Sequence, residues 1–116
     1  MGLFSTSAVK FPWTELYSVQ QLEQLLASDD KVLIFKHSTR CSISSMVLNR
    51  FERDFEQNSK IIPVFLDLIK HREISNLIAD KMNVYHQSPQ VILIEKNTVL
   101  HHASHNEIDA LNLNKL

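Results

Sequence analysis

Glycine and cysteine are almost absent from this chain of 116 residues, which contains one of each. Because the single glycine is Gly2, the glycine-rich phosphate loops of Rossmann and P-loop proteins are excluded. The formal net charge of −1 provides no basic field for nucleic acid or an anionic membrane surface, so we expect neither partner. No apolar run approaches the roughly 18 to 20 residues of a membrane span.

A single cysteine cannot form an intramolecular disulfide, and no secretory signal pattern is present, so we expect a reducing, cytoplasmic location. The composition, 44% hydrophobic and 22% charged, is ordinary for a globular protein. We expect one domain over residues 1–116 and a monomer. Residues 1–10 lack periodicity, which predicts a flexible lead-in.

The cysteine lies in the stretch Val32–Ser44, which reads VLIFKHSTRCSIS. Its first four residues form an unbroken apolar run, which predicts a strand buried on both faces. Helical apolar spacing begins at Ile43, so Cys41 falls on the first turn of the helix that follows this strand.

The surroundings of Cys41 predict a reactive thiol. Thiols react as thiolates, and a helix N-terminus or a cationic neighbour stabilises that anion. We expect Arg40, Ser42 and Ser44 to stabilise or position the thiolate, with His37 adding positive potential. The alternative is a buried structural cysteine, which the polar neighbours make less favourable.

The remaining periodicity predicts an α–βαβ–α–ββ–α order. Capping-box patterns at Ser18/Gln21 and Ser104/Glu107 open the first and last helices, and Lys96-Asn97 forms a hairpin turn. The predicted helices cover 18–28, 43–57, 72–82 and 104–111, and the predicted strands cover 32–35, 61–66, 91–95 and 98–103. The inward positions predicted for the second helix are Ile43, Met46, Val47, Phe51 and Phe55.

This order describes an α/β protein with a thioredoxin-like fold, in which a four-stranded mixed sheet carries helices on both faces. Pro63 lacks an N–H donor, so its strand should lie at a sheet edge or carry a bulge. The cysteine motif is C-x-x-S (Cys41 to Ser44) where redox proteins of this type commonly have C-x-x-C.

The carboxyl edge of the parallel strands should gather the functional residues. Cys41 lies there, and the antiparallel hairpin brings Ser88-Pro89 and the Ser104-His105 pair to the same edge. A cis Ser88–Pro89 bond would expose the Ser88 backbone to an extended ligand.

Four segments carry a resemblance to a known family: KHSTRCSIS, HREISNLIADK, VYHQSPQVILIEKN and HHASH. They resemble the monothiol bacilliredoxins, thioredoxin-like proteins of the bacillithiol system, and the likeness covers about Trp13 to Ile108. The family commonly has proline directly after the cysteine, where this chain has Ser42, so the environment and reduction potential of the thiol are less constrained by the resemblance.

The resemblance implies a cytoplasmic thiol-disulfide oxidoreductase that removes bacillithiol from protein mixed disulfides through Cys41. Bacillithiol would be a co-substrate, with no tightly bound cofactor and no metal. The partners would be bacillithiolated proteins and a low-molecular-weight thiol. Ser88-Pro89 would be a cis-proline pair, and the groove would be lined by His86, Ser88, Pro89 and His105.

Three alternatives stay open. The same cysteine could hold an iron–sulfur cluster between two protomers, or it could be a redox sensor that small thiols cap. The third is a metal site, because His101 and His105 have ligand spacing if they share a helix. A strand there would place them in solvent instead. Similarly, His86 could be a packing histidine bonded to backbone, and Trp13 is expected to be a packing anchor.

Overall fold

The computed structural model describes residues 11–56 and 60–116, so the predicted lead-in 1–10 lies outside the described residues. Within these ranges no helix is both long enough and apolar enough to cross a membrane. The elements, in chain order, are β1 (Thr14–Glu15), α1 (Val19–Ala27), β2 (Lys31–His37), α2 (Ser42–Asp54), β3 (Ile61–Asp67), α3 (Arg72–Met82), β4 (Gln90–Glu95), β5 (Thr98–Ser104), the 3-10 helix η2 (His105–Glu107) and α4 (Ala110–Leu113).

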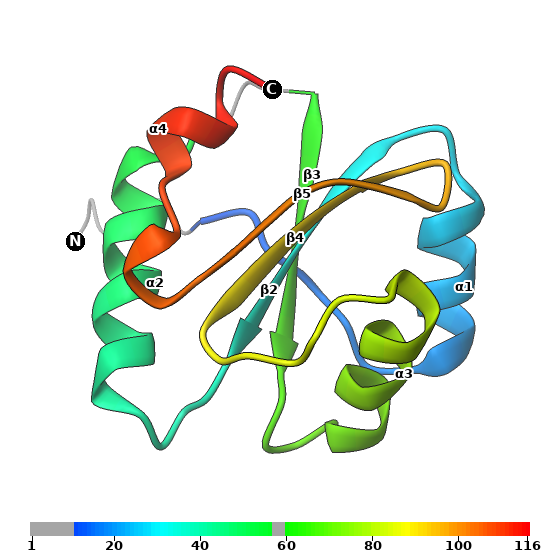
Figure 1. Cartoon of the computed structure of the whole chain (residues 1–116), viewed down its shortest axis with the longest axis horizontal. Helices are drawn as coiled ribbons and strands as arrows, with labels where there is room; N and C mark the ends of the chain where they lie inside the picture. The colour runs from blue at the N-terminus through cyan, green and yellow to red at the C-terminus, as the bar shows by residue number, and fades with distance from the viewer. Residues whose placement is uncertain (1–10, 57–59) are drawn as a thin grey trace, which may run out of the picture.

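The described strands form one mixed sheet in the order β1-β3-β2-β4-β5, with β2 at its centre (Figure 1). β1 and β2 pair with β3 in parallel, whereas β4 pairs antiparallel with both β2 and β5. The sequence predicted four of these five strands. The additional strand, β1, has two residues, which is too short to show periodicity, and it forms because the chain meets β3 at Val64 and Phe65.

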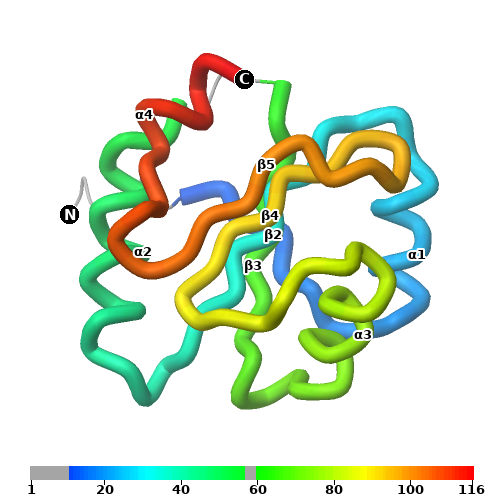
Figure 2. The backbone as a smooth tube through the Cα atoms, viewed as in Figure 1, coloured from blue at the N-terminus to red at the C-terminus, as the bar shows by residue number. Residues whose placement is uncertain are grey.

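Helices cover both faces of the sheet, as predicted. α1 and α3 lie on one face and α2 and α4 on the other, so the backbone forms three layers (Figure 2). Successive residues of β2 point to opposite faces, so this strand supplies both cores. Val32 and Ile34 pack towards α1 and α3, whereas Leu33 and Phe35 pack towards α2 and α4.

Three local predictions agree with the structure. The Ser18 hydroxyl caps α1 by accepting the Gln21 N–H at 3.1 Å. α3 spans Arg72–Met82, as predicted. Lys96 and Asn97 both have positive φ, 50° and 63°, as the two central residues of a tight hairpin turn require.

The predicted inward face of α2 is partly wrong. Val47, Phe51 and Phe55 are buried, but Ile43 is 53% exposed and Met46 is 72% exposed. A helical period of 3.6 residues allows Ser44 rather than Ile43 to lie one turn before Val47 on the inward face, and Ser44 is fully buried. The helix ends at Asp54, three residues before the predicted end.

The predicted last helix is also corrected. Ser104 precedes the short η2, but its side chain makes no capping hydrogen bond. α4 starts only at Ala110, where Asp109 caps it by accepting the Leu111 N–H at 3.0 Å. Ile108 between the two pieces is extended and buried, so burial of this side chain interrupts the helix.

Pro63 lies in β3, which is the second strand and not the edge strand. β1 covers only Val64 and Phe65 of β3. Because N–H groups alternate sides along a strand, the Pro63 nitrogen points to the same side as Phe65, whose carbonyl accepts the Leu16 N–H. β1 begins opposite Val64, one residue after Pro63, so no ladder bond to β1 is lost there. The register between β2 and β3 is continuous through Pro63, so the predicted edge position or bulge is wrong.

Trp13 is a packing anchor, as predicted. Its ring stacks on Phe51 with centroids 5.7 Å apart and meets Phe35 and Phe65 edge-on. Its Nε1–H donates to the Glu52 carboxylate at 2.6 Å. The amphipathic indole therefore closes the α2 face of the core with its polar atom satisfied.

Candidate active site

Cys41 is a free, half-buried cysteine at the N-cap of α2. Its N–H donates to the Ser38 carbonyl at 3.2 Å, which closes the turn after β2, and its own carbonyl accepts the Ser45 N–H at 3.1 Å. The first N–H groups of a helix lack intrahelical partners, and the helix dipole is positive at this end. The thiol therefore lies where the backbone favours negative charge.

The three residues predicted to stabilise the thiolate lie in two different environments. Arg40 and Ser42 flank Cys41 and are exposed. Ser44 is buried, and its hydroxyl oxygen lies 2.8 Å from His37 Nδ1 and accepts the Ser38 N–H at 3.2 Å. The structure thus joins Ser44 to His37 and Ser38 in the turn beneath the thiol.

His37 closes β2 on the α2 face of the sheet. It is 6% exposed, and its ring lies 5.5 Å from the Phe65 ring. Burial lowers the pKa of His37 from its ordinary value, and the nearby carboxylates of Asp67 and Glu52 raise it by less. The expectation that His37 adds positive potential is therefore corrected, because burial favours the neutral imidazole.

The segment that leads into β4 lies at the same end of the sheet as the turn from β2 to α2 (Figure 1). The Ser88–Pro89 peptide bond is cis. β4 starts at the next residue, Gln90, which pairs with Lys36 near the end of β2. The Pro89 carbonyl accepts the His105 N–H at 3.0 Å. Backbone pairing thus brings Ser88, Pro89 and His105 to the strand end that leads to Cys41.

Two polar atoms on either side of Pro89, Ser88 Oγ and Gln90 Oε1, are buried and have no hydrogen-bond partner among the described residues. The Gln90 amide is otherwise anchored, since its Nε2 donates to the Tyr85 carbonyl at 2.9 Å. Buried polar atoms are almost always paired in folded proteins. These two exceptions beside one proline show that the turn has hydrogen-bonding capacity left for a ligand.

His86 was expected to line the groove, but the structure turns it inwards. Its Nδ1 lies 3.3 Å from Lys36 Nζ and 3.2 Å from Ser75 Oγ of α3. The packing interpretation of His86 therefore describes its contacts better, although its partners are side chains and not backbone. Arg72 at the start of α3 is close enough to affect its charge.

Lys36 is a residue that the sequence analysis did not identify. It is fully buried, and its ammonium donates to the Ser75 carbonyl at 3.3 Å. Burial lowers the pKa of Lys36 to about 8. Burial, together with the charges of Lys36 and Arg72, also lowers the pKa of His86. The sequence did contain a signal for the burial of Lys36, because this lysine directly follows an apolar run and lies in the same strand.

The described residues contain no group of three or more His, Cys, Asp or Glu side chains arranged to hold a metal ion. His101 lies in β5 and His105 begins η2, so the two do not share a helix. The spacing that suggested a metal site therefore does not place these imidazoles on one helical face.

Solved structures of similar shape are thioredoxin-fold proteins. A candidate oxidoreductase with a thioredoxin fold is 28% identical, with a TM-score of 0.80, over 90% of this chain and 92% of that one. Thioredoxin from Malassezia sympodialis is 15% identical, with a TM-score of 0.71, over 91% and 88%. Thioredoxin from Trypanosoma brucei brucei is 18% identical, with a TM-score of 0.67, over 91% and 88%.

The two thioredoxins share only the fold with this chain, because their sequence identity is low. The structure that is 28% identical supports an oxidoreductase activity. A family model described as monothiol bacilliredoxin BrxC matches residues 14–113, which include every element from β1 to α4. One cysteine in the whole sequence agrees with the monothiol description. Family and fold together support a thiol oxidoreductase, and the chain belongs to the monothiol bacilliredoxin (BrxC) family.

Proposed function

We propose that this protein removes bacillithiol from protein mixed disulfides in the cytoplasm, with Cys41 as the nucleophile. One observation carries the proposal: Cys41 is half-buried at the start of α2, and the chain has no second cysteine with which it could form a disulfide. The position three residues later holds Ser44, which is buried and bonded to His37. Transfer to an external thiol is then the available disulfide chemistry.

The reaction consists of two thiol–disulfide exchanges. The Cys41 thiolate attacks the bacillithiol sulfur of the mixed disulfide, forms the Cys41–bacillithiol disulfide and expels the protein thiolate, which takes a proton from solvent. A second low-molecular-weight thiolate then attacks the bacillithiol sulfur, becomes its disulfide partner and releases the Cys41 thiolate. Electrons balance at each step, because one disulfide breaks as another forms.

The neighbouring residues have distinct roles in this proposal. Arg40 and Ser42 are exposed beside the sulfur and would stabilise its negative charge together with the N-terminus of α2. Ser88, Pro89 and His105 would line the groove that receives the mixed disulfide, and the unpartnered Ser88 Oγ offers a hydrogen bond to it. Ser44 would position the thiolate from the buried side of the turn, where its hydroxyl contacts His37.

The test is a mass-spectrometric assay on a protein that carries one bacillithiol adduct. The wild-type chain should release the adduct and gain one bacillithiol on Cys41 when no resolving thiol is present. Added low-molecular-weight thiol should restore free Cys41 and allow repeated turnover. Cys41→Ser should lose the release, because an alkoxide does not form at neutral pH and serine is a poor nucleophile towards sulfur.

A wild-type sample alkylated with iodoacetamide is the matched control, since it blocks the same sulfur without a substitution. Release that continues unchanged in both the alkylated protein and Cys41→Ser would show that Cys41 is not the nucleophile. A bacillithiol adduct that forms on Cys41 but is never resolved would instead identify a capped sensor thiol.

A further inference from the structure

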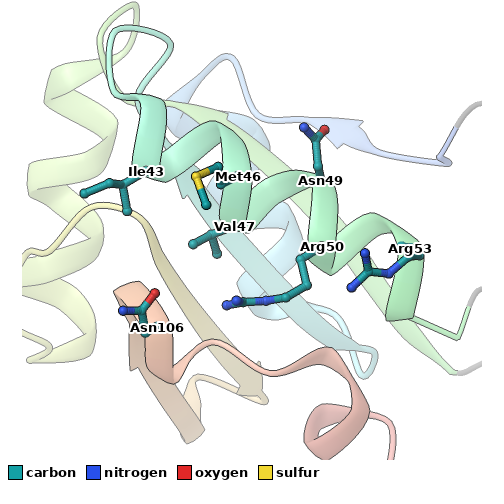
Figure 3. Close-up of a pocket in the computed structure, with 7 residues that line it drawn as sticks. All are labelled: Ile43, Met46, Val47, Asn49, Arg50, Arg53 and Asn106. Atoms are coloured by element: carbon teal, nitrogen blue, oxygen red, sulfur yellow. The ribbon is translucent and has the colours of Figure 1, made fainter.

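A groove that the reaction described above does not use has its first lining residue, Ile43, two positions after Cys41. Its volume is about 550 Å³, and it runs between α2 and η2 (Figure 3). In Figure 3, Val47 and Arg50 extend from α2 towards the side on which Asn106 of η2 lies. The lining residues are Ile43, Met46, Val47, Asn49, Arg50, Arg53 and Asn106.

The groove begins with apolar side chains close to the thiol. Ile43 is two residues after Cys41 and Met46 five, and both are largely exposed, at 53% and 72%. A helix rises about 1.5 Å per residue, so these side chains extend from the thiol over the first ~7 Å of α2. Large apolar side chains this exposed beside a reactive residue indicate a contact surface for a ligand.

The far end of the groove carries the Arg50 guanidinium, which pairs with no carboxylate in the part of the chain that the structure describes. Arg50 is half-buried, and its Nη2 donates to the Ile108 carbonyl at 3.3 Å. Within residues 11–56 and 60–116, the one ion pair formed by an arginine is that of Arg53 with Asp54, at 3.1 Å. A guanidinium has five N–H donors, so Arg50 retains donors for an anion while its backbone contact holds it in place.

We propose that this groove binds the carboxylate-bearing part of the small thiol in the mixed disulfide, with Arg50 as the anion contact. The inference depends on the proposed function, because the transfer step joins Cys41 to the small-thiol sulfur and so places the rest of that molecule beside Cys41. Arg50 lies nine residues after Cys41, about 13 Å along the helix.

Two arguments favour a small thiol over an acidic segment of the protein substrate. The groove volume lies within the range of about 300–1,000 Å³ that is typical of small-ligand sites. Protein substrates also differ from one another, whereas the small thiol is the part that all their mixed disulfides share. Bacillithiol fits the charge of the groove, because its malate group carries carboxylates.

The experiment compares two adducts of one protein, a mixed disulfide with bacillithiol and one with the uncharged 2-mercaptoethanol. The wild-type chain should show a kcat/KM for the bacillithiol adduct about tenfold higher, as expected for one charge-assisted hydrogen bond. Arg50→Gln should lower this ratio about tenfold. Lys81→Gln removes the same charge from α3, outside the groove, and should keep the wild-type ratio.

Substitutions at Met46 test the groove without removing the Arg50–Ile108 contact. Met46 is 72% exposed, so a charge is tolerated there. Met46→Glu should lower the ratio by repelling the carboxylates, and Met46→Lys should raise it. A wild-type ratio in Arg50→Gln and in both Met46 variants would overturn the inference and leave the proposed function intact.

Two further outcomes separate the proposals. An equal loss for both adducts in Arg50→Gln would show that the groove contacts the protein part of the substrate, which overturns the inference. No release of either adduct by the wild-type chain would overturn the proposed function, and the groove assignment with it.

Discussion

His37 Nδ1 and Ser44 Oγ lie 2.8 Å apart, in the buried turn between β2 and α2. The hydroxyl also accepts the Ser38 N–H at 3.2 Å. If His37 donates its proton, the Ser44 hydroxyl hydrogen is free to point towards Cys41, one helical turn away on the same side of α2. If Ser44 donates instead, that hydrogen is directed to the imidazole. The pair thus couples the state of His37 to the Ser44 hydroxyl of the C-x-x-S motif.

The first prediction concerns the stability that this pair contributes. Ser44→Ala should lower the free energy of unfolding by about 1–3 kcal/mol, because it leaves His37 Nδ1 and the Ser38 N–H buried without a partner. Urea unfolding is the measurement. Ser42→Ala, on the exposed side of the same turn, should change the free energy by less than about 0.5 kcal/mol.

The double variant His37→Phe/Ser44→Ala completes the cycle. Phe65 already borders the site, so an apolar ring at position 37 is compatible with its surroundings. Replacing both partners by apolar groups removes the unpaired His37 Nδ1, while the Ser38 N–H stays unpaired, so the double variant should recover part of the loss. Strictly additive losses would contradict a coupled pair.

The second prediction concerns stability in acid. Burial lowers the pKa of His37, so the unfolded chain binds a proton at this residue at a higher pH than the folded chain. The stability from neutral His37 is therefore fully present above the ordinary histidine pKa of about 6.5 and is lost as the pH falls through the lowered folded value.

Chemical denaturation between pH 7.5 and pH 5 measures this effect. His86 has a lowered pKa as well and should add to the same slope. The variant His37→Phe should flatten the dependence and leave the part that belongs to His86. A slope as steep in the variant as in the wild type would show that His37 does not contribute.

The third prediction concerns Lys36, whose pKa burial lowers from 10.5 to about 8. Between these two pH values the unfolded chain binds more protons, so wild-type stability should rise with pH across this window. The full shift corresponds to ~3 kcal/mol of unfavourable burial of the charge at pH 7.

Lys36→Met keeps a similar length and removes the charge, together with the contacts to the Ser75 carbonyl and His86 Nδ1. After about 1–2 kcal/mol for the loss of these contacts, we expect the free energy of unfolding at pH 7 to rise by ~1–2 kcal/mol. The gain should shrink towards pH 10, where the wild-type amine is neutral. A destabilised variant at pH 7 would instead show that the hydrogen bonds of Lys36 outweigh the cost of its burial.

Local sequence determined much of the fold. Apolar runs identified β2, β3 and β4, the hairpin turn identified β5, and a capping box placed the start of α1. Adjacent residues that tolerate positive φ marked the turn between β4 and β5. The same local pattern located Cys41 at the start of a helix, and the single cysteine agrees with the monothiol family. These features depend on residues near one another in sequence.

Tertiary packing decided the inward face of α2 and the environment of each polar residue at the site. Ile43 and Met46 are as apolar as Val47, and only the position of the sheet determines which side of the helix is buried. Likewise, Lys36 and His37 follow an apolar run, but their contacts with Ser75 and Ser44 arise from opposite faces of one strand. Periodicity specifies which residues share a face; the free energy of burying each face depends on its partner, which the assembled sheet and helices supply.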